Sequence, residues 1–245
     1  MPAIEARGLT KRFGAKTAVD GLDLTVEKGE MLALLGVNGA GKTTTIRMLS
    51  CLSVPTAGEC FVCGHSCREE AAQVKQRIGL SPQDTAVAEN LTVQENLAFM
   101  AQVYGLDRKA AAQRTEEIIA LMGLGEVVKS RAKTLSGGWK RRLSIAMALI
   151  GSPEVLFLDE PTLGLDVLAR RELWRVIAGL KGRITILLTT HYMEEAEQLA
   201  DRIAVMIGGK IAACGTLAEL EAATGKTGLE EAFVAIAEGS VKGDA

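Results

Sequence analysis

The sequence predicts an α/β fold with a mainly parallel β-sheet, an antiparallel β subdomain near the N-terminus and an inserted α-helical subdomain. The segments VLFLD (155–159) and ITILLTTH (184–191) are apolar and rich in β-branched residues, and the helical stretch ARRELWRVIAGL lies between them. A strand, a helix and a strand in this order give parallel strands. MLALLG (31–36) has the same apolar character, and residues from about 91 to 149 show helical spacing.

The composition is that of a globular protein of mixed α/β type. The 245 residues are 48% hydrophobic and 24% charged, which allows a sizeable core in one or two domains. The formal net charge of −2 supplies no basic field, so we expect no nucleic acid as a partner. No stretch reaches the ~18 apolar residues of a membrane span, and MPAIEARGLTKRFG lacks the apolar core of a signal peptide. The sequence therefore indicates a cytoplasmic protein that reaches a membrane only through a partner.

Near the N-terminus, short antiparallel strands are expected. Val19, Leu22, Leu24 and Val26 come close to alternating with polar residues, before a turn at 28–30. Beyond about residue 217 the chain is rich in Ala and Glu, which favours two short helices.

A glycine-rich loop follows the apolar segment 31–36. GVNGAGKT (36–43) satisfies G-x-x-x-x-G-K-[ST], and a helix is expected from about Lys42 to Leu52. Glycines let backbone N–H groups face phosphate oxygens, and the helix N-terminus adds positive charge. Lys42 is expected to neutralise the β- and γ-phosphates, and Thr43 to bind Mg²⁺. The predicted binding residues of this loop are Gly36, Asn38, Gly39, Ala40, Gly41, Lys42, Thr43 and Thr44.

Acidic and polar side chains follow three other predicted strands. Asp159 ends VLFLD and is placed to reach the Mg²⁺ shell, and Glu160 is placed to orient or deprotonate water. His191 ends ITILLTTH and faces the same crevice near the γ-phosphate, and Gln83 after IGLS offers its amide to metal or water. The alternatives are structural: two acids that cap a helix, a histidine that ends a strand, and a polar turn residue.

The five cysteines, in a chain without an export signal, argue against a disulfide framework. Cys60, Cys63, His65 and Cys67 lie close together in CFVCGHSC, but a second pair of ligands is missing from the pattern of a zinc site. We interpret the segment as a short strand with small, reduced side chains, and a metal site as the alternative.

The order of these motifs resembles the ATP-binding subunit of an ABC transporter. GVNGAGKTT, SPQD, LSGGW, VLFLDEP, GLD and TTH occur in the order and approximate spacing of that family, over about residues 3–220. Ser-Gly-Gly in LSGGW lies upstream of the carboxylates in VLFLDEP. This arrangement distinguishes the ABC branch from other P-loop families. The resemblance implies a P-loop NTPase core that hydrolyses ATP with Mg²⁺. It makes Glu160 the general base, and it groups Asp159 and Gln83 around Mg²⁺ and the attacking water.

The resemblance also implies the domain organisation. Residues 1–220 are expected to form the ATP-binding domain, with the helical insert at about 84–150, and residues 221–245 a short helical C-terminal extension. Phe13, in KRFG, would stack on adenine, with an ordinary core aromatic as the alternative. Asp166, in GLD, would communicate across a dimer.

LSGGWKRRLSIAMAL (135–149) looks like a helix start that holds an anion. Ser136 is a favoured N-cap, and the amides near Gly137 and Gly138 attract negative charge. In the ABC family this segment closes over ATP held by a second subunit, which implies a head-to-tail pair of two copies with two ATP molecules between them. Trp139 stands where the family usually has Gln, and we interpret it as tolerated. A simple helix start with a basic face is the alternative.

LTVQENLAFMAQVYGLD (91–107) and LEEAFVAIAEG (229–239) resemble subunits of ABC-2 type exporters, including drug exporters, which pair with separate membrane permeases. We therefore expect an ATPase, held through a permease at the cytoplasmic face of the membrane, that drives export by ATP-driven dimerisation. Two alternatives stay open. A soluble ABC ATPase acting on nucleic acid or ribosomes would show two cassettes, a long coiled coil or a basic patch. A nucleotide-gated binding module would lack Glu160 or His191.

Overall fold

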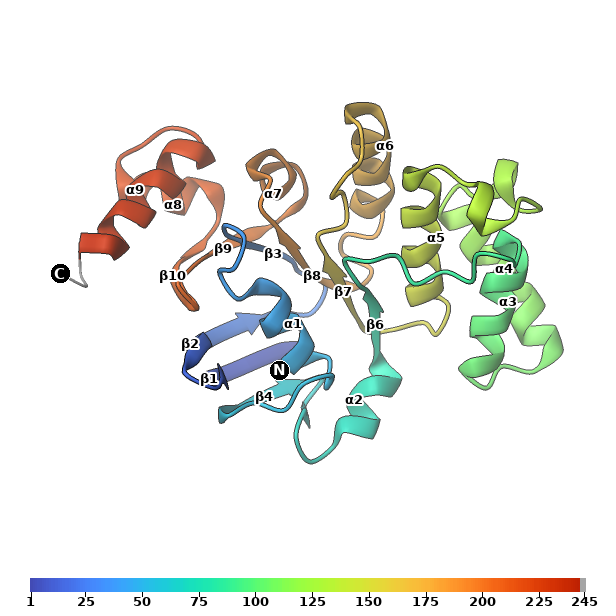
Figure 1. Ribbon diagram of the computed structural model, residues 1–245, viewed down its shortest axis with the longest axis horizontal. Helices are drawn as coiled ribbons and strands as arrows, with labels where there is room; N and C mark the ends of the chain where they lie inside the picture. Colours follow the sequence, from blue (N-terminus) through green and yellow to red (C-terminus); the bar gives the residue numbers. More distant parts are fainter. Residues whose placement is uncertain (243–245) are drawn as a thin grey trace.

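The larger of two sheets runs through the middle of the protein (Figure 1). The structure is a computed structural model that describes residues 1–242, with side chains up to residue 239. Within that range the strand order of this sheet is β10-β9-β3-β8-β7-β6, and all neighbours except β10 and β9 pair in parallel. The predicted, mainly parallel sheet is confirmed. Its strands are β3 (Met31–Leu35), β6 (Ile78–Ser81), β7 (Val155–Asp159), β8 (Thr185–Thr190), β9 (Arg202–Ile207) and β10 (Lys210–Gly215).

The smaller sheet is the predicted antiparallel one. Its order in the described chain is β2-β1-β4-β5, formed by β1 (Ile4–Phe13), β2 (Lys16–Val26), β4 (Ala57–Val62) and β5 (His65–Ser66). With 10 and 11 residues, β1 and β2 are longer than the short strands that the sequence predicts. The hairpin continues because a register shift absorbs the uneven step from Val19 to Leu22 in the apolar pattern.

Helix α1 (Lys42–Leu49) packs between the two sheets. Leu32 and Leu34 of β3 face it, while the alternate residues of β3 face helices on the other side of the sheet. The prediction that this helix runs to Leu52 is wrong. Ser50 is its C-cap, and Cys51 has a φ of 57°, in the left-handed region that ends a helix.

The opposite face of the large sheet is covered by helices that share one apolar core with it. They include α5 (Gly137–Leu149), α6 (Val167–Ala178), α7 (Met193–Leu199) and α9 (Leu229–Lys242). Helix α9 and its neighbour α8 (Leu217–Thr224) lie at one end of the molecule (Figure 1). Of the predicted helical extension 221–245, residues 243–245 lie outside the described part.

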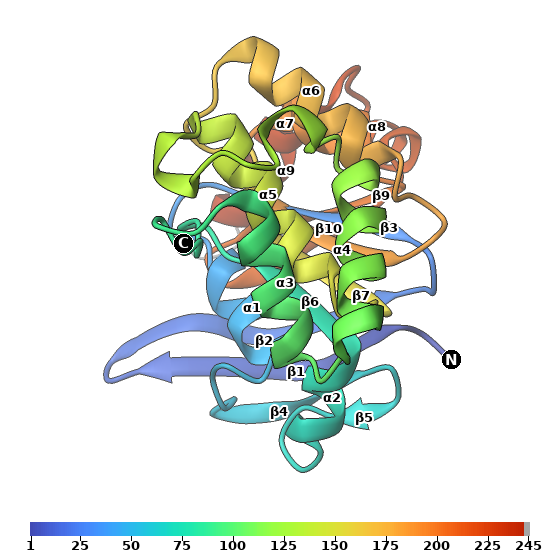
Figure 2. The same cartoon turned by 90° about the vertical axis from the view of Figure 1, so that its right-hand side faces the viewer.

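The helical insert forms the other end of the molecule, and Figure 2 shows α3 (Val93–Val103) beside α4 (Arg108–Leu121). Thr92 begins α3 with a reciprocal capping box that includes Glu95, and Asp107 caps α4. The remaining short elements are α2 (Ala71–Arg77) and two 3₁₀ turns, Gly125–Val127 and Ala132–Thr134. Among residues 1–242, the longest apolar helices fall short of what a bilayer crossing requires.

Strand β6 carries the chain into the loop of Gln83, and α5 packs closely against it. A Cβ atom at Gly79 of β6 would collide with the carbonyl oxygen of Ala148 and lie 3.1 Å from Pro153 Cγ. We expect Gly79→Ala to lower the free energy of unfolding by about 1–3 kcal/mol, because backbone atoms must move apart. Urea unfolding measures this change.

Gly125→Ala is the matched control, since a Cβ atom there meets open space. We expect it to change the free energy of unfolding by less than about 0.5 kcal/mol. A Gly79→Ala variant as stable as the control would contradict this packing of α5 on β6.

Candidate nucleotide-binding site

The glycine-rich loop lies between β3 and α1. The N-cap of α1 is Gly41, with a φ of 108° and no side-chain cap bond, so the first N–H groups of the helix point towards the loop opening. Only glycine fits at position 41. A Cβ atom there would collide with the carbonyl oxygen of Ala18 and lie 2.7 Å from Met206 Cε. The loop has the backbone of an anion cradle at a helix N-terminus.

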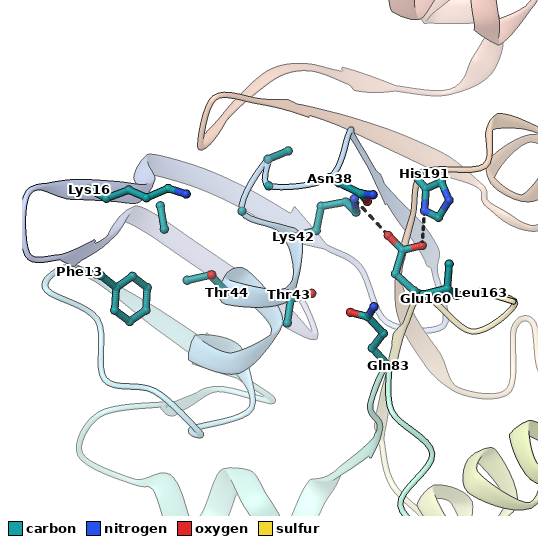
Figure 3. Close-up of a pocket in the computed structure, with 14 residues that line it drawn as sticks. Phe13, Lys16, Asn38, Lys42, Thr43, Thr44, Gln83, Glu160, Leu163 and His191 are labelled. Atoms are coloured by element: carbon teal, nitrogen blue, oxygen red, sulfur yellow. Dashed lines mark hydrogen bonds and ion pairs between the residues drawn. The ribbon is translucent and has the colours of Figure 1, made fainter.

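A cavity of about 450 Å³ opens over this loop. This volume lies in the range of small-molecule sites. Figure 3 shows Phe13 and Lys16 on one side and Lys42, Glu160 and His191 on the other, with Gln83 below Lys42 and Glu160. The cavity is lined by Phe13, Lys16, Ala18, Asn38, Gly39, Ala40, Gly41, Lys42, Thr43, Thr44, Gln83, Glu160, Leu163 and His191.

A chain of charged and polar contacts crosses the cavity wall. Lys42 Nζ lies 3.1 Å from Glu160 Oε1, and His191 Nδ1 lies 2.7 Å from Glu160 Oε2. Lys42 Nζ also donates a hydrogen bond of 2.6 Å to the carbonyl oxygen of Gly36. Lys42 and Glu160 are each only 5% exposed. The structure thus brings together three side chains that the sequence places at the ends of separate segments.

Glu160 adopts an unusual backbone conformation. Its φ of 49° lies in the left-handed region, which costs on the order of 1–3 kcal/mol for a residue other than glycine. Its N–H group donates to the carbonyl oxygen of Thr189 (3.1 Å) and to Thr189 Oγ1 (3.0 Å) on the neighbouring strand β8. These bonds hold the carboxyl group between Lys42 and His191.

Asp159, Thr43 and Gln83 form the second polar group of the site. Thr43 Oγ1 donates a hydrogen bond of 3.1 Å to Asp159 Oδ1, and Thr189 Oγ1 donates one of 2.6 Å to the same oxygen. Gln83 lines the same cavity, and its side chain lies near Thr43 (Figure 3). Hydroxyl, carboxylate and amide oxygens are the ligands that Mg²⁺ prefers, so the donor set fits this ion.

Arg141 holds the loop of Gln83 in place. It is 5% exposed and donates hydrogen bonds to the carbonyl oxygens of Pro82 (2.7 Å) and Gln83 (2.6 Å). Burial lowers the pKa of its guanidinium group, and the nearby carboxylates, Asp159 first, partly offset this. Arg141 belongs to the basic triplet 140–142, and its side chain points inward. The alternative interpretation of the segment 135–149, a simple helix start with a basic face, does not account for this.

Phe13 lies at the open side of the cavity. Its side chain is 55% exposed, and Lys11 Nζ lies 5.1 Å from the centre of its ring. The alternative of an ordinary core aromatic is therefore wrong. Lys16 pairs with Phe13 across the hairpin. The sequence analysis did not identify Lys16, Ala18 and Leu163 as residues that line the cavity. The turn at Gly14 was the signal that could have placed Lys16 beside Phe13.

Several predicted site residues lie outside this cavity. Ser136 caps α5, where its Oγ accepts a 3.5 Å hydrogen bond from the N–H group of Trp139. Asp166 caps α6 through a 2.9 Å bond from the N–H group of Ala169. The remaining predicted residues outside the lining are Gly36 and Asp159, which contact Lys42 and Thr43, and Gly137 and Gly138, which begin α5.

The starts of α5 and α6 are neighbours. A Cβ atom at Gly138 would lie 3.2 Å from Ala169 Cβ, and one at Gly137 would lie 3.6 Å from Leu165 Cδ2. Trp139 is held by Arg142, whose guanidinium carbon lies 4.8 Å from the centre of its ring. Ser136 and Asp166 thus belong to one continuous face.

The cysteine segment forms a hairpin of two short strands instead of the one that the sequence predicts, and its cysteines are free thiols. Cys60 lies on β4, Cys63 in the turn and His65 on β5, with Cys67 just beyond it. Cys60 and Cys67 are buried, and His65 Nδ1 contacts Glu70 Oε1 at 2.9 Å. Among residues 1–242, no group of three or more His, Cys, Asp or Glu side chains is arranged to hold a metal ion.

A buried carboxyl group lies behind the cavity. Glu195 of α7 is 0% exposed, and its Oε1 accepts hydrogen bonds from Thr162 Oγ1 (2.8 Å) and Trp174 Nε1 (3.0 Å). It joins the segment that follows Glu160 to the helix that follows His191. Burial raises the pKa of Glu195 by more than these hydrogen bonds lower it.

A glycine loop between a parallel strand and a helix, with carboxylates at the end of a nearby strand, defines a P-loop nucleoside triphosphatase. A sequence model of the ABC transporter family matches residues 19–163. The chain therefore belongs to the ABC transporter family, and it is an ATP-binding, ATP-hydrolysing subunit.

Known relatives agree with this assignment. The chain is 46% identical over 224 residues to the daunorubicin resistance ATP-binding protein DrrA3 of Streptomyces coeruleorubidus, covering 91% of this chain and 71% of that protein. It is 40% identical over 240 residues to the linearmycin resistance ATP-binding protein LnrL of Bacillus subtilis (strain 168), covering 94% and 77%. A solved ATP-binding subunit of an ABC transporter superposes with a TM-score of 0.84 at 29% identity, covering 96% and 99%.

The buried carboxyl group predicts a pH dependence of stability. Because the pKa of Glu195 is raised above its ordinary value of 4.5, the folded chain keeps a proton that the unfolded chain has lost. The stabilisation is full below that value and is lost as the pH rises through the raised pKa. Glu195→Gln keeps an acceptor oxygen and cannot ionise. We expect it to remove this loss, a slope of up to about 1.4 kcal/mol per pH unit within the window.

Urea unfolding of both chains at a series of pH values measures the difference. Glu194→Gln, an exposed neighbour on α7, is the control and should follow the wild-type pH profile. Parallel profiles for wild type and Glu195→Gln would contradict the raised pKa.

Proposed function

We propose that the chain powers the export of a drug-like substrate through a separate membrane permease, by ATP-driven pairing of two copies. The 46% identity to a daunorubicin resistance protein, over nearly all of this chain, carries this proposal. The similarity to a linearmycin resistance protein supports it as well. The permease would hold the chain at the cytoplasmic face of the membrane. Residues 1–220 would be the ATP-binding domain, with a helical insert at about 84–150, and residues 221–245 a helical extension.

In this proposal ATP lies along the cavity. Adenine stacks on the exposed ring of Phe13, and the phosphates meet the N–H groups of the loop and Lys42. Thr43, Asp159 and Gln83 would hold Mg²⁺. Mg²⁺ held there would supply positive charge that offsets the negative charge developing on the phosphates. The contact between Thr43 and Asp159 supports this assignment, since their oxygens already meet at 3.1 Å.

Glu160 is the proposed general base. The triphosphate would compete with its carboxylate for Lys42 Nζ, and the carboxylate would then face the attacking water. His191 would keep Glu160 oriented through the 2.7 Å contact and reach the γ-phosphate at the same edge of the sheet. Water then attacks the γ-phosphate in line with the leaving oxygen.

The second copy completes the site. Ser136, Gly137 and Gly138 lie outside the cavity of their own chain, which supports a contact with ATP held by the partner. The exposed amides at the start of α5 would meet the γ-phosphate, and Asp166 on the same face would communicate between the two sites. With Glu160 and His191 present in each copy, both sites of a homodimer would be competent.

Glu160→Gln tests the chemistry. We expect ATP hydrolysis by the purified chain to fall about 100-fold or more, because the amide cannot accept the proton from water. ATP binding should persist, and ATP-dependent dimers should accumulate on size-exclusion chromatography. Persistent binding separates lost chemistry from lost folding, which matters because Glu160 is the buried partner of Lys42.

Glu154→Gln is the matched control, since this exposed carboxylate lies outside the cavity and should leave the rate unchanged. Export is measured in cells that carry the chain, or one of the same variants, together with the permease. The quantity measured is the amount of daunorubicin that the cells retain. Wild type should lower retention, and Glu160→Gln should not. Equal retention with and without the wild-type chain, despite normal hydrolysis, would contradict this substrate class.

Ser136→Asp tests the contact between copies. Aspartate caps a helix as well as serine does, so folding should be preserved. Its carboxylate would face the γ-phosphate held by the partner, and we expect hydrolysis and ATP-dependent dimers to fall about tenfold or more. Ser136→Thr keeps both the cap and the hydroxyl, and it should stay close to wild type. Full hydrolysis by a monomeric Ser136→Asp chain would contradict the proposed dimer.

A further inference from the structure

Three thiols meet at the C-terminal end of α1, outside the nucleotide cavity. Cys67 Sγ lies 3.5 Å from the carbonyl oxygen of Leu49, and Cys60 Sγ lies 4.0 Å from that of Met48. The N–H group of Cys67 donates a 2.9 Å hydrogen bond to the carbonyl oxygen of Cys60, and Cys51 packs against the apolar cluster that contains both residues. Three chain segments, the end of α1, strand β4 and the loop after β5, therefore bring their cysteines to one place.

The thiols of Cys51 and Cys67 differ in their surroundings. Cys51 is partly exposed, and its left-handed φ of 57° turns the chain out of α1. Contact with the Cys67 thiol lowers the pKa of Cys51, burial opposes this, and the ammonium group of Lys75 lowers the pKa further. Cys67 is only 6% exposed, and its thiol contacts and burial raise its pKa. An accessible, more acidic thiol beside a buried one is typical of cysteine pairs that react with oxidants.

We propose that Cys51 and Cys67 form a redox pair that a small-molecule disulfide, such as oxidised glutathione, converts into an intramolecular disulfide. The Cys51 thiolate attacks one sulfur of the small disulfide, breaks its S–S bond and releases one thiolate. Cys67 then loses its proton and attacks Cys51 Sγ, which expels the second thiolate. The two released thiolates take up the two protons, so two cysteine thiols are oxidised and one disulfide is reduced to two thiols.

The bond would join two segments that lead into the nucleotide cavity. Helix α1 ends beside Cys51 and begins at Lys42 and Thr43, whose side chains line the cavity. The segment after Cys67 continues through α2 and β6 to Gln83, which also lines the cavity. A covalent link between the two segments restricts their relative movement, which a cycle of closure and reopening requires. The oxidised chain therefore turns over ATP more slowly.

The test uses the purified full chain with oxidised glutathione, followed by N-ethylmaleimide and mass spectrometry. We expect two of the five cysteines to be protected from alkylation, a mass lower by two hydrogen atoms, and a peptide that links residues 51 and 67. Cys51→Ser should abolish the bond. Cys214→Ser, a change at an exposed thiol outside the cluster, should leave it intact.

Three results would overturn the proposed disulfide between Cys51 and Cys67. The first is that glutathione remains attached to Cys51, and the second is a peptide that links Cys60 with Cys67. The third is that no disulfide forms under conditions that modify Cys214. Cys67→Ala provides a second variant, and it should leave glutathione attached to Cys51.

Hydrolysis is measured on the same samples. We expect oxidation to slow hydrolysis at least about twofold, with recovery in dithiothreitol and no effect on Cys51→Ser. If the disulfide forms completely and the rate of hydrolysis does not change, the proposed regulation of hydrolysis is overturned. The disulfide itself would still be established. Because the linked peptide is read independently of hydrolysis, failure of the pair and failure of the proposed transport function are distinguishable.

Discussion

The contact of Glu160 with Lys42 and His191 is the interaction on which the rest of the site depends. Its members come from the start of α1, the end of β7 and the end of β8, so one buried carboxylate joins three segments of the chain. Loss of one partner from a buried ion pair costs about 3–5 kcal/mol, because the remaining charge has no water around it. The same burial makes Glu160 and Lys42 sensitive to a new charge. A triphosphate that binds Lys42 changes the environment of Glu160 at once.

The parallel sheet makes this contact possible. Strands β3, β8 and β7 are neighbours and run in the same direction, so their carboxyl ends lie at one edge. The antiparallel sheet contributes the opposite wall, where the hairpin of β1 and β2 presents Phe13. The close approach of Ala18 to Gly41 joins this wall to the phosphate loop. The cavity thus forms between two sheets that share one apolar core around α1.

The sequence predicted the parts of the fold that repeat a pattern, and it missed those that depend on a single backbone or side-chain choice. Continuous apolar runs predicted β3, β7 and β8, because strands buried on both faces leave no polar positions. The end of α1 was missed because it depends on the left-handed backbone conformation of Cys51. The residue type cysteine gives no indication of that conformation. Arg141 was missed because arginine usually lies in water, and only the folded structure shows the two carbonyl groups that accept its hydrogen bonds.

In the proposed dimer, Ser136 and Asp166 would complete the site of the other copy. Each caps a helix, the two helix starts are neighbours through Gly138 and Ala169, and both caps lie outside the cavity of their own chain. The bond from the N–H group of Trp139 to Ser136 Oγ is long, at 3.5 Å, and therefore weak. A phosphate from a second copy would replace a weak contact with charge-assisted hydrogen bonds to the same helix start. The exchange would favour association only when that phosphate is present, and it would link pairing to the nucleotide.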